Sequence, residues 1–208
     1  MTPVSTEIPV HRQHARPPVL ALDDRRGTWG MALFIATEAT LFVMLLFSYY
    51  YTSRGNNRWQ VHEAPKLHYS LPMLAVLLTS SGVLYWGEQQ VKKHRYGAAR
   101  GALLTTILLG IGFLVLTFLE YSEHLKTLRP STDAYGSTFY TLTSLHGAHV
   151  VFGLLMLCWV MIVPRWEPAR RTPHRPYHNV AMYWHFVDTV WLFLVILLYI
   201  VPNIYNIA

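Results

Sequence analysis

The sequence is poor in charged residues and has almost no cysteine. Only 13% of its 208 residues are Asp, Glu, Lys or Arg, whereas soluble domains of this size carry roughly 25%. This deficit excludes an ordinary soluble domain, because most of the chain needs no contact with water. The single cysteine, Cys158, lies within an apolar run and rules out an internal disulfide.

Sequence motifs of catalysis and cofactor binding are also missing. There is no phosphate-binding loop, cysteine-rich cluster or nucleophile elbow, so we expect no catalytic residue in this chain. The net charge of +6 would suit a nucleic-acid partner, but the Lys and Arg residues form short clusters between long apolar runs. Such clusters are typical of loops that flank a membrane, and we expect no nucleic-acid binding.

The first 26 residues are polar and rich in proline, and they lack the apolar core and cleavage site of a signal peptide. We expect residues 1–26 to form a flexible cytoplasmic arm. Residues 27–208 would then form the membrane domain.

Five apolar segments are long enough to cross a bilayer as helices, which needs about 20 residues each. Helices are favoured because backbone polar groups must be paired internally within lipid, and the alternating polarity of barrel strands is not seen. The sequence therefore predicts an all-α integral membrane protein with a bundle of five transmembrane helices. The predicted spans are Trp29–Tyr51, Ser70–Trp86, Gly101–Tyr121, Ser137–Val163 and Ala181–Val201.

The distribution of Lys and Arg predicts the orientation of these spans. Five of the 17 lie in the first and third loops. The other twelve would share the opposite side, which the positive-inside rule assigns to the cytoplasm. The N-terminus would then be cytoplasmic and the C-terminus outside. The twelve are Arg12, Arg16, Arg25, Arg26, Lys92, Lys93, Arg95, Arg100, Arg165, Arg170, Arg171 and Arg175.

Several ionisable residues lie within the predicted spans, where their insertion is costly and by default indicates function. Glu38 is nine residues beyond Trp29, which at about 1.5 Å per residue places it near the membrane centre. It is either a hydrogen-bonded structural carboxyl or one that handles protons or contacts a partner. Thr37 and Thr40 offer nearby hydroxyl groups.

Two further pairs share a helix face because their members are three residues apart. His146 and His149 form one pair, and His185 and Asp188 form the other, in which Asp188 could orient the imidazole ring. For both pairs, a contact between helices and a functional site remain open alternatives.

Glu120, Glu123 and His124 cluster at the outer end of the third span, where we favour an interfacial hydrogen-bonded group. Di-iron bundles use Glu-x-x-His pairs with additional Glu residues. Here the residue three positions after Glu120 is Glu123, and His124 comes one position later. We therefore expect no metal site. Haem is no better supported, since two histidines three apart on one helix cannot provide opposite axial ligands.

Six segments together resemble subunit III of the haem–copper terminal oxidases, especially of the cytochrome c oxidase type, over essentially the whole chain from residue 29. The run Tyr-Trp-His-Phe-Val-Asp is highly specific for this family. In chain order, the segments are Trp29-Gly-Met31 with Glu38, Leu119-Glu-Tyr-Ser-Glu123, Tyr135-Gly-Ser-Thr-Phe139, Leu145-His-Gly-Ala-His149, Tyr183-Trp-His-Phe-Val-Asp188 and Val190-Trp-Leu-Phe193.

The resemblance implies a short, five-helix form of a subunit that binds neither haem nor copper. Haem a and copper would belong to partner subunits, with subunit I in direct contact, subunit II and others nearby, and cytochrome c docking on the complex. It also implies a V-shaped cleft that holds phospholipid. Trp29, Trp184 and His185 match family positions near lipid or helix packing and are candidates for lipid binding. Glu38 matches the family's buried, carbodiimide-reactive carboxyl, and His146 and His149 match its histidine pair.

The sequence departs from the family pattern in two places, at His178 and at the adjacent residues Glu88 and Gln89. His178 occupies a position where larger members often carry Glu, so the contact of that carboxylate would be absent or altered. Glu88 and Gln89 replace a His-His pair of some members. Arg165, at the predicted cytoplasmic end of the fourth span, is a candidate for pairing with a lipid phosphate.

The resemblance predicts an accessory subunit of an aa3-type oxidase in a bacterial plasma (inner) membrane, which supports proton uptake and protects the catalytic subunit during turnover. The equivalent subunit of a quinol oxidase, or a homologue associated with nitric oxide reductase, is an alternative. A proton-coupled transporter acting alone is a third, which inverted repeats or discontinuous helices would favour. Neither feature is visible in the sequence.

Overall fold

The computed structural model describes residues 19–55, 67–124, 134–162 and 174–201. Every residue in these ranges is helical except the turn at 93–95. The helices are α1 (Val19–Gly55), α2 (Leu67–Lys92), α3 (Tyr96–His124), α4 (Ala134–Ile162) and α5 (His174–Leu194), and α5 continues into a π-helix, η1 (Val195–Ile200).

All five helices are long and apolar enough to cross a membrane, which confirms the predicted five-helix fold. Each is longer than its predicted span, because hydropathy detects only the apolar part of a helix. In α2, for example, the helix continues past Trp86 through polar residues to Lys92.

The predicted boundary of the N-terminal arm at residue 26 is wrong. Helix α1 already begins at Val19, so residues 19–26 are helical. The charged run Asp23–Arg26 interrupts the apolar pattern, so a hydropathy criterion does not detect this extension. Residues 1–18 lie outside the described part of the chain.

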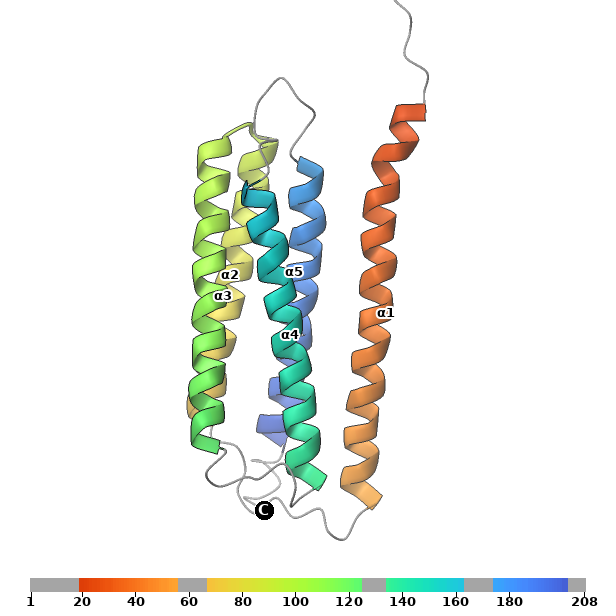
Figure 1. Cartoon of the computed structure of the whole chain (residues 1–208), viewed down its shortest axis with the longest axis vertical. Helices are drawn as coiled ribbons and strands as arrows, with labels where there is room; N and C mark the ends of the chain where they lie inside the picture. Colours follow the sequence, from red (N-terminus) through yellow and green to blue (C-terminus); the bar gives the residue numbers. More distant parts are fainter. Residues whose placement is uncertain (1–18, 56–66, 125–133, 163–173, 202–208) are drawn as a thin grey trace, which may run out of the picture.

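The helices form a bundle in which α5 contacts α1, α2 and α4, while α2 packs extensively on α3 (Figure 1). Helix α1 stands at one side of the bundle and contacts α4 and α5 (Figure 1). Most of its apolar surface faces outward, as the exposed side chains of Leu33, Val43, Met44, Phe47 and Tyr51 demonstrate. Such a surface requires lipid or another apolar partner.

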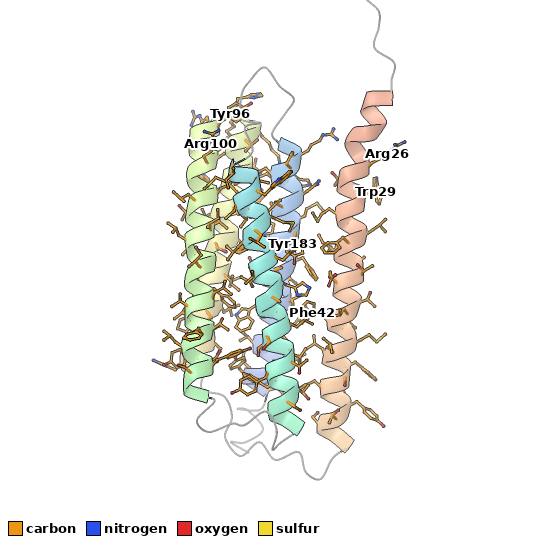
Figure 2. All side chains as sticks on the ribbon, viewed as in Figure 1. Arg26, Trp29, Phe42, Tyr96, Arg100 and Tyr183 are labelled. Atoms are coloured by element: carbon orange, nitrogen blue, oxygen red, sulfur yellow. The ribbon has the colours of Figure 1, made fainter. Side chains whose placement is uncertain are left out.

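A tight turn joins α2 to α3 and makes them antiparallel neighbours. His94 adopts a φ of 58°, in the left-handed region that commonly ends a helix. The backbone N–H of Arg95 donates to the carbonyl of Gln90 at 2.9 Å. This turn lies at the same end of the molecule as Arg26, Tyr96 and Arg100 (Figure 2).

Two glycines make room for the indole ring of Trp184, which is completely buried at the centre of the bundle. A Cβ atom at Gly110 of α3 would lie 2.8 Å from Cη2 of this ring, and one at Gly153 of α4 would lie 2.9 Å from Cε3. Trp184 Nε1 donates a hydrogen bond of 2.9 Å to Ser80 Oγ on α2. Small residues thus allow close helix approach, and the tryptophan ties four helices into one core.

Candidate functional site

The candidate site consists of polar side chains near the middle of the membrane spans. Glu38, His149, Ser81, His185 and Asp188 each lie within about one helical turn of the middle of the span to which they belong. The fold joins them into two hydrogen-bonded groups, one between α1 and α4 and the other between α2 and α5.

The first group is a pair formed by Glu38 of α1 and His149 of α4. Glu38 Oε2 lies 3.0 Å from His149 Nε2, with the two side chains 22% and 13% exposed. Phe42, which projects from α1 toward the bundle, packs its ring edge-on against the imidazole at 4.9 Å (Figure 2). Thr37 and Thr40 instead bond to backbone carbonyls of their own helix, so Glu38 takes its partner from another helix.

The two contacts of the His149 ring determine how many protons the pair holds. His149 Nδ1 lies 2.8 Å from the carbonyl oxygen of Leu145, and because a carbonyl only accepts, Nδ1 must carry a proton. The contact between Nε2 and Glu38 then needs a second proton, which resides either on the carboxyl or on the ring. In this geometry the pair is a carboxylic acid with a neutral imidazole, or a carboxylate with an imidazolium.

The second group joins His185 and Asp188 of α5 through Ser81 of α2. Ser81 Oγ lies 2.7 Å from His185 Nδ1 and also hydrogen-bonds Asp188 Oδ2. The expected contact between Asp188 and His185 therefore runs through a serine hydroxyl. Nothing in the sequence indicates this role of Ser81, because a serine in an apolar span suggests only a small packing residue.

A serine between a carboxyl and an imidazole can pass a proton in either direction. If the proton starts on Asp188, the carboxyl donates to Ser81 and the hydroxyl donates to His185 Nδ1. If Nδ1 is protonated, both bonds reverse and Asp188 is a carboxylate. The group can therefore exchange a proton between Asp188 and His185, both on α5, through the Ser81 hydroxyl of α2 without moving a heavy atom.

His146, the other member of the predicted histidine pair, does not contact Glu38 in this way. Its buried ring stacks on Trp191 of α5 at a centroid separation of 5.0 Å. The ring of Phe113 on α3 meets it edge-on at 5.8 Å. The two histidines share a helix but have different surroundings, one acidic and the other aromatic.

Two of the residues that depart from the family pattern contact each other. Glu88 Oε1 on α2 lies 3.2 Å from His178 Nδ1 on α5 and 2.9 Å from Lys92 Nζ. The carboxylate is nearly buried, with 8% of its side chain exposed. In this chain a carboxylate of α2 and an imidazole of α5 are therefore paired, and the expected difference from larger family members stays a prediction.

The predicted cluster at the end of α3 is described only in part. Glu120 is buried and accepts a hydrogen bond of 2.9 Å from the hydroxyl of Tyr199 in η1. It is therefore hydrogen-bonded within the protein, near the end of the third span, and its membership of an interfacial cluster with Glu123 and His124 stays a prediction. The side chains of Glu123 and His124 lie outside the described part of the structure.

The predicted lipid-binding residues differ in their surroundings. Trp29 is 68% exposed on α1, as lipid contact requires, and His185 is partly exposed. Trp184 is completely buried, so it takes the alternative role in helix packing and its assignment to lipid binding is wrong: Gly110 and Gly153 leave room for its ring in the core. Arg165 lies outside the described residues.

Within the four described ranges, no group of three or more His, Cys, Asp or Glu residues is placed to hold a metal ion. The described histidine contacts are with carboxyl, hydroxyl, carbonyl and aromatic groups. The absence of a metal site from the whole chain stays a prediction.

Comparison with known proteins identifies the family. A family model described as cytochrome c oxidase subunit III matches residues 20–202. Cytochrome c oxidase subunit 3 of Artemia franciscana is 34% identical over 176 residues, covering 82% of this chain and 67% of that protein. The subunit 3 of Drosophila yakuba is 33% identical over 179 residues. That of Pan troglodytes is 33% identical over 198 residues, covering 91% of this chain and 73% of the relative. With this match and the five apolar helices, the chain belongs to the cytochrome c oxidase subunit III family and is a multi-pass membrane protein.

Proposed function

We propose that this chain is a non-redox accessory subunit of an aa3-type cytochrome c oxidase that supports proton uptake and the stability of the catalytic subunit. Family membership supports its place in an oxidase complex. In this role it contains no catalytic residue and binds neither haem nor metal. Haem a and copper reside in partner subunits, where oxygen is reduced.

The Glu38–His149 pair is the observation that carries the proton-handling part of this proposal. Its geometry requires one proton that either partner can hold. The pair lies in the middle of its spans and remains partly exposed on the α1 side. A proton stored here stays close to any subunit that covers α1, so the pair could buffer proton uptake by that subunit.

Helix α1 is the proposed docking element for subunit I. The exposed side chains of Leu33, Met44 and Phe47 form part of an apolar surface that a second membrane protein could cover. Subunit II and other oxidase subunits complete the complex, and cytochrome c docks on it as the electron donor.

Phospholipid is the proposed ligand of this subunit. The exposed Trp29 and the partly exposed His185 are suited to lipid contact, and Arg165 supplies a cation for the headgroup. We further propose that these lipids occupy a V-shaped cleft between helices. The protein lies in a bacterial inner membrane with its N-terminus in the cytoplasm and its C-terminus outside, as the distribution of Lys and Arg favours.

Purification through an affinity tag on this chain, in mild detergent, tests the proposal. The expected result is recovery of larger subunits together with haem a absorbance and oxygen consumption driven by reduced cytochrome c. Consumption driven only by quinol would identify the alternative oxidase and overturn the choice of electron donor. Recovery of a stable, solitary protein without haem-bearing partners would contradict the proposal altogether.

A further inference from the structure

Four buried polar atoms have no hydrogen-bond partner among the described residues. They are both ring nitrogens of His146, Oδ1 of Asp188 and Nε1 of Trp191. Buried polar groups in proteins are nearly always satisfied by another protein group or by ordered water. Four unsatisfied atoms in one bundle therefore call for a common partner.

The three side chains that carry these atoms are neighbours. The His146 and Trp191 rings stack at 5.0 Å with an interplanar angle of 25°. Asp188 and Trp191 are three residues apart on α5, which places them on one helix face in successive turns. Phe113 packs edge-on against both rings, at 5.8 Å from His146 and 5.0 Å from Trp191. The polar atoms are thus enclosed by apolar and aromatic groups.

This cluster also adjoins both hydrogen-bonded groups of the candidate site. His146 is three residues from His149 on α4, and Asp188 is itself bonded to Ser81. His146 and Trp191 both lie within about one turn of the middle of their spans. Polar groups therefore follow one another across the bundle at one depth, from α1 through α4 and α5 to α2.

We propose that His146, Trp191 and Asp188 hold buried water, which joins Glu38–His149 to Asp188–Ser81–His185 in one hydrogen-bonded row across the bundle. This inference deepens the proposed role in proton handling and rests on it. Nothing in the sequence pattern indicated the row, because its members come from four helices.

The hydrogen-bonding capacity of the unsatisfied atoms matches that of water. A neutral His146 ring has one nitrogen that donates and one that accepts, Trp191 Nε1 only donates, and Asp188 Oδ1 accepts. Water likewise donates two hydrogen bonds and accepts two, and a buried water typically needs two to four polar partners. A cation fits this set poorly, because the indole N–H would point its positive end toward it.

The row lets a proton move within the plane of the membrane. When the Glu38–His149 pair releases its proton to the water at His146, the proton can pass toward Asp188, and Ser81 can relay it to His185. Because all these groups lie at similar depth, this shift is neither driven nor opposed by the membrane potential. The row would spread one proton between the α1 side of the bundle and the α2–α5 interface.

Infrared difference spectroscopy on the complex purified through this chain tests the row. The Glu38 carboxyl band is assigned by its loss in Glu38→Gln, and the effect of Asp188→Asn on that band is then measured. We expect Asp188→Asn to shift the Glu38 band in the otherwise unchanged protein. The shift should be lost in Trp191→Phe, which removes the N–H group and keeps an aromatic ring, and also in His146→Phe.

Ser80→Ala is the matched control, since it removes the neighbouring hydroxyl that bonds Trp184 and leaves the row intact. It should preserve the shift. In addition, exchange into heavy-oxygen water should shift the frequency of an O–H stretching band of buried water. This band should be absent in Trp191→Phe. The inference would be overturned if the Glu38 band did not shift in Asp188→Asn, or if the shift were still observed in the presence of Trp191→Phe. Either result would leave the co-purification of haem-bearing subunits untouched, so the two proposals fail separately.

Discussion

Glu88 on α2 and His178 on α5 form a carboxylate–imidazole contact of 3.2 Å at two of the positions where this sequence departs from the family pattern. In this chain the carboxylate of the pair lies on α2 and the imidazole on α5. Lys92, 2.9 Å from the same carboxylate oxygen, adds a cationic partner on α2.

Exchanging the side chains of Glu88 and His178 should preserve the contact between carboxylate and imidazole. Glu88→His alone places an imidazole against His178 and Lys92, and His178→Glu alone places two carboxylates together, so each should destabilise the protein by about 1–3 kcal/mol. The double variant should recover most of this loss. The midpoint of thermal unfolding of the purified complex measures this recovery. A loss of stability in the double variant equal to the sum of the losses in the two single variants would disprove the pairing.

The Glu38–His149 pair predicts an asymmetry between single and double substitutions. His149→Leu leaves the carboxyl of Glu38 without its partner and should cost about 1–3 kcal/mol, and Glu38→Leu should have a similar effect on the ring. Because replacing both members removes both polar groups, Glu38→Leu/His149→Leu should be more stable than either single variant. Thermal unfolding of the three variants decides this, and strictly additive losses would argue against direct coupling.

The glycines around Trp184 should tolerate no side chain. Gly110→Ala and Gly153→Ala place a methyl group within 3 Å of a rigid, fully buried ring, and overpacking of this kind costs about 1–3 kcal/mol. Gly112→Ala is the matched control on the same helix as Gly110, since nothing lies within 4 Å of its added Cβ atom. Thermal unfolding should separate Gly112→Ala from the other two; equal stability of all three would contradict the packing described.

Bound phospholipid should depend on Trp29 and not on Trp184. Trp29→Ala removes an exposed ring and should lower the amount of lipid that co-purifies with the complex. Trp184→Phe alters a ring that is closed off from the surface and should leave the lipid content unchanged, although it loses the bond to Ser80. Lipid phosphorus per haem is the measurement. If Trp184→Phe lost lipid and Trp29→Ala did not, the lipid would lie inside the bundle, which would contradict this prediction.

The average polarity of each segment was sufficient to predict the membrane-spanning helices. The direction in which each side chain points from its helix was not predictable in this way. The five apolar runs were sufficient to predict five helices, because burial in lipid demands them. The outward or inward orientation of a side chain is not contained in hydropathy, so Trp184 was assigned to lipid although its ring faces the core. Helix ends such as Val19 and Lys92 were missed for the related reason that polar residues can extend a helix beyond the membrane.

The candidate site was predicted as separate residues whose partners were unknown. Glu38 and His149 were both singled out, but they are 111 positions apart and no local spacing indicates their contact. The role of Ser81 was not predicted at all, since it emerges only when α2 lies against α5. Tyr199, which donates a hydrogen bond to Glu120, lies in a π-helix. A π-helix has more residues per turn than an α-helix, so a periodicity of about 3.6 residues does not predict which way its side chains point.

Comparison of the oxidase complex with and without this subunit tests its proposed role most directly. The chain is deleted, the remaining complex is purified, and its haem a content and oxygen consumption are followed over successive turnovers. We expect the depleted complex to retain its haem and its initial oxygen consumption and to lose activity sooner during turnover than the intact complex. Loss of haem a together with this chain, or equal lifetimes of the two complexes during turnover, would contradict an accessory role in supporting the catalytic subunit.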